Sequence, residues 1–253
     1  MPAPKKLEVQ TDEGVVECWV HRPSGGKHPG VLMYPDAGSV RPASHSMAER
    51  LAEAGYVVLL PNIFYRAGVY APFDFKTVFD VPEERERLMT LVRSLDLASA
   101  MRDAGHYLRV LKEQPGVLGE RFGVIGYCIG GRLAFATAGS HPKQIAAAAS
   151  VHGGSIATDA PDSPHLAAGQ IEARLYFAIA DEDRSCTPEQ QGKLAAALAA
   201  AHVDFAVEHF KGCAHGFAMS DFAVYDERAC DRQWEHVLDV LSDTLPQARE
   251  PFG

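Results

Sequence analysis

The sequence predicts an α/β fold: a doubly wound, mostly parallel sheet with helices on both faces, in a single domain of residues 1–253. Three observations predict it. Short apolar runs typical of buried strands alternate with segments whose apolar residues recur at helical spacing. Glycine and proline separate most of these segments, and no Ser/Gly-rich linker or internal repeat interrupts them. A length of 253 residues suits one large domain of this class.

The predicted strands are short and apolar. The first two, residues 7–10 and 15–20, flank Asp12-Glu13-Gly14 and therefore form a hairpin. The remaining strands are expected at 30–34, 56–60, 122–125, 145–151, 175–179 and 205–210. The many alanines of 145–151 make that segment ambiguous between strand and helix.

The predicted helices carry recognisable ends. Residues 46–54 end at Gly55, and residues 94–114, with apolar side chains at helical spacing, end before Pro115. Thr187, Pro188 and Gln190 are typical of a helix start, as N-cap, first residue and capping-box partner. Further helices are expected directly after Gly130 and over residues 226–245.

Residues 62–94 do not fit this alternation. Six aromatic residues crowd into its first half: Phe64, Tyr65, Tyr70, Phe73, Phe75 and Phe79. Two interpretations remain open, a lid or wall over an active site and a satellite apolar cluster beneath a long loop. The lid is favoured because the segment leaves the sheet at the carboxyl end of a strand.

Composition excludes several classes of function. The net charge of −9 argues against a nucleic-acid partner or an anionic membrane surface. Five scattered cysteines without a Cys-x-x-Cys pair argue against a disulfide framework or a zinc site, and we expect neither a metal nor an organic cofactor. No apolar run reaches membrane-spanning length, so a reducing cytoplasm is the expected location. The oligomeric state stays open, with a monomer among the alternatives.

One motif carries the expected chemistry. The apolar run 122–125 leads into Gly126-Tyr127-Cys128-Ile129-Gly130, and a small, apolar, helix-like segment follows. This is the strand–turn–helix pattern of a nucleophile elbow, with cysteine in place of serine. Small residues are needed at Gly126 and Gly130, where strand and helix crowd together on a strained backbone. The helix start favours a thiolate at Cys128. The alternative is a buried, inert cysteine in a glycine turn.

A base and an acid follow in the chain order this pattern requires. His215 lies after the strand 205–210, and Asp183 lies after the strand 175–179, so both belong at the sheet edge that carries Cys128. Asp181 is an alternative acid that lies less far into its loop. His152 also follows a strand but precedes the acid, which is the wrong order for the base, so we expect it to line the pocket.

The chain resembles the dienelactone hydrolase family of α/β-hydrolases. The resemblance rests on Gly126-Tyr127-Cys128-Ile129-Gly130-Gly131, the Asp183 loop, His215-Gly216-Phe217-Ala218, Met33-Tyr34-Pro35-Asp36-Ala37, Ala54-Gly55-Tyr56 and Pro61-Asn62-Ile63-Phe64-Tyr65-Arg66. It implies that the backbone N–H groups of Ala37 and Ile129 form an oxyanion hole. It also implies that Asp36, where the family usually has glutamate, contacts the nucleophile and controls its protonation.

The resemblance implies substrate-binding residues as well. Family members that act on dienelactones hold the substrate carboxylate with two arginines. Arg85 matches the first, with Arg87 as the alternative register, and Met219 stands where the second is expected. Losing that arginine removes a bidentate clamp, so a less anionic ester or lactone is the expected substrate. Tyr65 and His152 complete the candidate binding residues.

We therefore expect a cysteine-dependent hydrolase of small carboxylic esters or lactones that uses a Cys-His-Asp triad and a thioester acyl-enzyme. The first alternative is a general carboxylesterase or thioesterase acting on neutral substrates. The second is a non-catalytic binding protein on the same scaffold.

Overall fold

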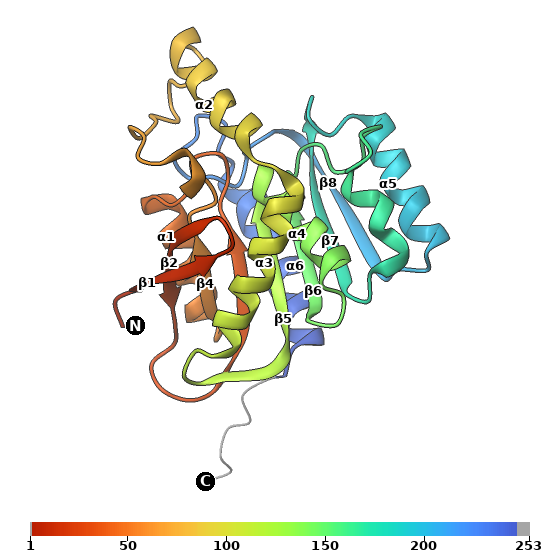
Figure 1. The fold of residues 1–253 in the computed structure, drawn as a ribbon. Helices are drawn as coiled ribbons and strands as arrows, with labels where there is room; N and C mark the ends of the chain where they lie inside the picture. Colours follow the sequence, from red (N-terminus) through yellow and green to blue (C-terminus); the bar gives the residue numbers. More distant parts are fainter. Residues whose placement is uncertain (1, 247–253) are drawn as a thin grey trace.

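The structure, a computed structural model, describes residues 2–246. Eight strands form one sheet in the order β1-β2-β4-β3-β5-β6-β7-β8 (Figure 1). The strands are β1 Lys5–Thr11, β2 Gly14–His21, β3 His28–Tyr34, β4 Val57–Pro61, β5 Val117–Tyr127, β6 Ile145–Val151, β7 Arg174–Glu182 and β8 Phe205–Ala214. β1 and β2 pair antiparallel, as the hairpin prediction requires, and β3 to β8 run parallel. The predicted α/β class is confirmed.

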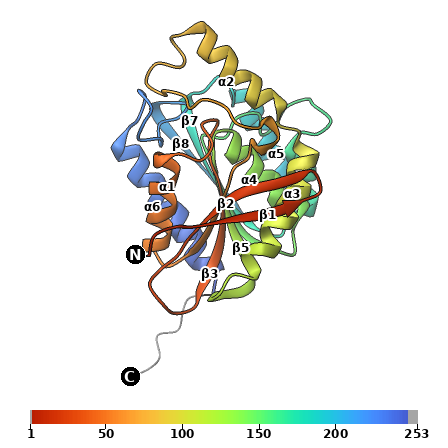
Figure 2. The ribbon, with the colours of Figure 1, turned by 60° about the vertical axis from the view of Figure 1, so that its left-hand side comes forward.

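Residues 2–246 contain six α-helices and two short 3-10 helices, of which α6 follows the last strand and the others lie between strands. They are α1 Pro42–Glu53, η1 Tyr65–Ala67, α2 Pro82–Ser94, α3 Leu97–Lys112, α4 Ile129–Ser140, η2 Pro164–Gln170, α5 Pro188–Ala200 and α6 Glu227–Thr244. α1 and α6 cover one face of the sheet, and α3, α4 and α5 lie on the other (Figure 2). Among the described residues, no helix has the length and apolar character needed to cross a membrane.

The helix ends follow local chemistry. Thr187 accepts a hydrogen bond from the backbone N–H of Gln190, so the predicted N-cap of α5 is confirmed. Asp96 caps α3 in the same way, so the helix predicted for residues 94–114 begins at Leu97. α2 lies inside the segment 62–94, where no helix was predicted. α1 begins four residues before the prediction, because Pro42 supplies its first turn.

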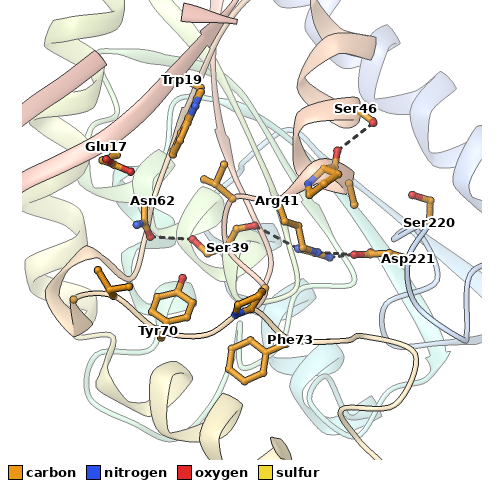
Figure 3. A pocket seen from close by; sticks show the side chains of 17 residues that line it. Glu17, Trp19, Ser39, Arg41, Ser46, Asn62, Tyr70, Phe73, Ser220 and Asp221 are labelled. Atoms are coloured by element: carbon orange, nitrogen blue, oxygen red, sulfur yellow. Dashed lines mark hydrogen bonds and ion pairs between the residues drawn. The ribbon is translucent and has the colours of Figure 1, made fainter. Parts of the chain in front are cut away.

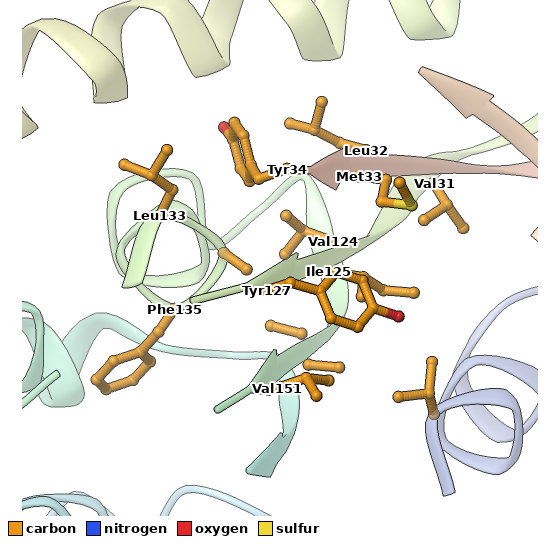
Figure 4. Close-up of a cluster of buried hydrophobic side chains, with 14 of the residues drawn as sticks. Val31, Leu32, Met33, Tyr34, Val124, Ile125, Tyr127, Leu133, Phe135 and Val151 are labelled. Carbon is orange, nitrogen blue, oxygen red and sulfur yellow. The ribbon is translucent and has the colours of Figure 1, made fainter. Parts of the chain in front are cut away.

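The centre of the core lies on β3, β5 and α4 (Figure 4). Val31, Leu32, Val124 and Ile125 are completely buried, as expected for central parallel strands covered on both faces. This packing fixes the ends of β3 and β5 side by side, with Tyr34 paired to Gly126. The chain segments that leave these two strands therefore meet at one edge of the sheet.

The aromatic-rich segment lies beyond that edge, where α2 projects from the body of the fold (Figure 1). Ring contacts link Phe64 to Tyr70, Tyr70 to Phe73 and Phe73 to Phe75. Phe75 then stacks on Phe222, at 4.7 Å between ring centroids and an angle of 5°. The segment thus packs against the chain that follows His215, a position that favours a wall beside the site.

Candidate active site

Cys128 lies at a tight corner between β5 and α4, with φ of 56° and ψ of −121°. The corner requires glycine on both sides. A Cβ atom on Gly126 would lie 1.8 Å from the carbonyl oxygen of Gly130, and one on Gly130 would lie 2.3 Å from that of Pro35. The prediction that Gly126 and Gly130 must be small is confirmed.

Cys128 differs from the other four cysteines in exposure. It is partly exposed, whereas Cys18, Cys186, Cys213 and Cys230 are buried. Burial, and to a smaller extent the charge of Asp183, raises the pKa of the Cys186 thiol to about 12. A thiol with so high a pKa is unreactive at neutral pH. Cys128 also precedes the N-terminus of α4, where the helix dipole favours an anion.

His215 connects Cys128 to Asp183. Its Nδ1 atom lies 2.7 Å from Oδ2 of Asp183, whose carboxylate is almost fully buried. Burial acts to lower the pKa of His215, but the charge of Cys128 and hydrogen bonds to Asp183 and Cys128 raise that pKa well above its ordinary value. The three predicted catalytic side chains therefore form one connected set.

The alternative acid lies elsewhere. Asp181 accepts a hydrogen bond from the backbone N–H of Gly212 at 3.1 Å and is exposed. Burial opposes the charge of Asp183, yet hydrogen bonds from His215 and Ser185 lower its pKa below the ordinary value. The geometry therefore pairs His215 with Asp183.

Ser185 is a site residue that was not predicted from the sequence. Its hydroxyl donates to Oδ1 of Asp183 at 2.6 Å and lies 3.1 Å from Nδ1 of His215. The backbone N–H of Ser185 donates to the same Asp183 oxygen at 2.8 Å. These bonds hold the carboxylate in place for His215. The spacing Asp183-Arg184-Ser185, typical of an Asx turn, is the signal that could have found it.

His152 lies beneath the elbow, where it is 1% exposed. The backbone N–H of Cys128 donates to its Nδ1 at 3.2 Å, and its ring centroid lies 5.2 Å from that of His215. Burial, followed by the charge of His215, lowers the pKa of His152 well below its ordinary value. His152 therefore holds the Cys128 backbone as a buried, neutral ring, and the structure does not support the pocket-lining position that we expected for it.

Ala37 and Ile129, the predicted oxyanion-hole residues, follow the ends of the neighbouring strands β3 and β5. Ile129 is the first residue of α4, so its N–H has no acceptor within the helix. Ala37 follows β3, which pairs with β5 next to the elbow. Among the hydrogen bonds of residues 2–246, neither N–H has an acceptor.

Asp36 does not bear out its expected contact with the thiol. Its two carboxylate oxygens bind Nη1 and Nη2 of Arg41, and the Gly38 N–H donates to Oδ1 at 2.9 Å. Burial raises the pKa of Asp36, while Arg41 acts in the opposite direction. Arg41 also binds Asp221 through Nε at 2.6 Å and Nη2 at 2.9 Å. Aspartate is short enough to be held by this arginine within its own loop.

Tyr65 also lies outside the site. Its hydroxyl is 2.9 Å from that of Thr11 and donates to Asp103 at 3.2 Å, on the β1–β2 side of the fold. Arg66 binds the same carboxylate. The aromatic ring next to the sheet edge therefore serves packing, and its expected substrate contact is not supported.

The two candidate arginines on α2, Arg85 and Arg87, point to different surroundings because they are two positions apart on a helix. Arg85 is exposed and borders an outer hollow with Phe79. Arg87 points inward, where it donates to the carbonyl oxygens of Ala71 and Pro72 and lies over the ring of Phe73. Arg87 is committed to these carbonyl oxygens, and the outer hollow that Arg85 borders contains none of Cys128, Asp183 and His215, so the expected clamp by Arg85 is not supported. Met219 is 1% exposed and packs in the core.

Comparison with known proteins identifies the family. The family model described as "Dienelactone hydrolase family" matches residues 16–245. The chain belongs to the dienelactone hydrolase family. Members of this family are hydrolases of ester or lactone bonds, and the expected resemblance is confirmed.

Relatives and solved structures cover nearly the whole chain. A Synechocystis sp. protein named "Putative carboxymethylenebutenolidase" is 26% identical over 224 residues, 87% of this chain and 88% of its own. The crystal structure of a "Putative Dienelactone Hydrolase" from Klebsiella pneumoniae has a TM-score of 0.81 at 21% identity, covering 95% of this chain and 98% of its own. A dienelactone hydrolase-like promiscuous phosphotriesterase from metagenomic libraries has a TM-score of 0.78 at 22% identity, covering 96% and 99%.

Proposed function

We propose that the protein hydrolyses carboxylic esters or lactones through a Cys128–His215–Asp183 triad. The observation that carries this proposal is the connected contact from Asp183 to His215 to the partly exposed Cys128. Clustered groups whose pKa values are shifted in this way are typical of catalytic sites.

The proposed reaction has two stages. The Cys128 thiolate attacks the substrate carbonyl, and the N–H groups of Ala37 and Ile129 stabilise the oxyanion. The carbon–oxygen bond then breaks, the leaving oxygen takes the proton held by His215, and a thioester remains on Cys128. A water molecule gives its proton to His215 and attacks the thioester, which releases the acid and restores the thiolate.

Two features support small substrates of low negative charge. The expected carboxylate ligands, Arg85 and Arg87, lie away from the site or bind backbone carbonyl oxygens, and Met219 is buried. A carboxylesterase or thioesterase activity on neutral substrates is therefore the second candidate function.

Trapping the thioester tests the mechanism. Wild-type protein mixed with 4-nitrophenyl acetate and quenched in acid is expected to gain the mass of one acetyl group on the peptide that contains Cys128. Cys128→Ala should give neither the adduct nor turnover, while Cys186→Ala, a buried control thiol, should keep both. A labelled peptide without Cys128, or full turnover in Cys128→Ala, would overturn the assignment. Complete absence of reaction in the wild type would favour a binding protein.

A further inference from the structure

A cavity of about 720 Å³ lies next to the site, between the start of α1, β2 and the loop 68–73 (Figure 3). It borders the two loops that carry the proposed chemistry. Gly38 and Ser39 follow the oxyanion residue Ala37 directly, and Asp221 belongs to the loop that follows His215. The cavity has the volume of a small-molecule site.

Three aromatic side chains, Trp19, Tyr70 and Phe73, form walls of this cavity (Figure 3). Ser39 lies next to Tyr70 on the cavity wall (Figure 3), and its hydroxyl donates to Asn62 at 3.0 Å. Ser39 and Tyr70 therefore form one side of the cavity. Rigid aromatic faces favour a flat ring or a cationic group over a free carboxylate.

The only guanidinium on the cavity wall, among the described residues, is already saturated. Arg41 uses Nε, Nη1 and Nη2 to bind both Asp36 and Asp221, and it lies 4.5 Å from the ring centroid of Phe75. No N–H pair remains in the fork geometry that a substrate carboxylate would need.

The net charge next to the cavity is therefore negative. Two carboxylates, Asp36 and Asp221, share the single positive charge of Arg41. Both oxygens of Asp36 accept from the guanidinium, an arrangement that favours the ionised carboxylate. Asp221 and Glu17 are the acids on the cavity wall, and Glu17 is paired with Lys6 and adds no net charge.

We propose that this cavity binds the uncharged or cationic, ring-sized part of the substrate, and that the Asp36–Arg41–Asp221 bridge excludes substrates that carry a carboxylate there. This inference rests on the proposed function and names the substrate class of that site. The rings of Trp19, Tyr70 and Phe73 bind the ring of the substrate. The net negative charge of the Asp36–Arg41–Asp221 bridge repels a substrate carboxylate.

Binding to a variant without the nucleophile tests the inference separately from catalysis. Cys128→Ala protein is titrated with 4-tert-butylphenyl, 4-(trimethylammonio)phenyl and 4-carboxyphenyl acetate, three esters that differ only in the distal group. Tryptophan fluorescence reports binding, because Trp19 lines the cavity while Trp234 is buried. The carboxylate ester should bind about tenfold more weakly than the other two. Adding Trp19→Phe should remove the signal.

Two variants separate ring binding from charge discrimination. Asp221→Asn in the Cys128→Ala background should strengthen binding of the carboxylate ester by about threefold to tenfold and change the neutral ester by less than about twofold. Tyr70→Leu should weaken all three, whereas Tyr225→Leu, an exposed tyrosine outside the cavity, should change none.

The outcomes distinguish the two proposals. Equal affinity for the three esters, or no response to Asp221→Asn and Tyr70→Leu, overturns the cavity assignment even if Cys128 becomes acylated in the wild type. The expected binding pattern without acylation of Cys128 leaves the cavity assignment standing and overturns the proposed mechanism.

Discussion

Two corners of the same sheet edge are built on opposite physical grounds. At the end of β5, the Cys128 corner is shaped by close backbone packing, with Gly126 and Gly130 against carbonyl oxygens. At the end of β3, the Arg41 corner is shaped by charge, with one guanidinium between Asp36 and Asp221. The Cys128 corner requires that Gly126 and Gly130 have no side chain, whereas the Arg41 corner requires that each charged group keeps its partner of opposite charge.

This difference determines which changes each corner tolerates. A backbone contact has no side chain that can move away, so one added methyl group at the Cys128 corner displaces the chain. Removing one partner of an ion pair lowers the free energy of unfolding most when the remaining charge is buried and unpaired. Substitutions at the two corners should therefore differ in size and in what they affect.

The largest effect is expected at the elbow. Gly126→Ala should destabilise the protein by more than about 4 kcal/mol or prevent folding, because its Cβ atom would overlap the Gly130 carbonyl. Gly192→Ala is the matched control, since nothing lies within 4 Å of its Cβ and it sits inside α5. The control should stabilise the protein by about 0.5–1 kcal/mol. Denaturant unfolding measures both, and equal curves would show that the corner is not sterically fixed.

Next in size is the acid of the triad. Asp183→Asn keeps the shape of the side chain but removes the charge that stabilises the His215 imidazolium, so kcat for an activated ester should fall about 10²- to 10⁴-fold. In Asp181→Asn, kcat should fall by less than about twofold, because Asp181 contacts the Gly212 backbone and not His215. The opposite ranking in steady-state kinetics would exchange the two assignments.

The charge corner should respond more moderately. Arg41→Met leaves Asp36 buried without its partner and should destabilise the protein by about 3–5 kcal/mol. Lys143→Met breaks an exposed ion pair with Glu172 and should cost less than about 1 kcal/mol. Thermal and denaturant unfolding at neutral pH provide the measurement. Similar losses in both variants would mean that Asp36 is not committed to Arg41.

The smallest effect concerns pH. The folded-state pKa of His152 lies well below its ordinary value, so below about pH 6.5 the unfolded chain binds a proton that the folded chain does not. The free energy of unfolding therefore falls as pH falls through this window. His152→Asn keeps an acceptor for the Cys128 N–H and should reduce the slope by up to about 1.4 kcal/mol per pH unit. Parallel stability curves for variant and wild type would contradict a buried, neutral ring.

The same contrast explains what the sequence could predict. The elbow was predictable because steric limits act between near neighbours, and Gly126 and Gly130 are visible as letters beside Cys128. His215 and Asp183 were predictable because parallel strands bring their carboxyl ends to one edge. Both inferences need only local residue types and the order of strands.

The charge bridge could not be read in this way. Arg41 and Asp221 are 180 positions apart, and nothing in either segment marks the other as a partner. Arg85 and Arg87 illustrate the same limit, because two positions on a helix point to different surroundings. The role of Ser185 was easier to predict, because its hydrogen bond to Asp183 spans only two residues.

The ring of Phe222 lies face to face with Phe75 and also fills the space against Gly216, where an added Cβ would meet it at 2.6 Å. Gly216 is the immediate neighbour of His215. The Phe75–Phe222 stack therefore joins the aromatic-rich segment to the backbone next to the His215 imidazole.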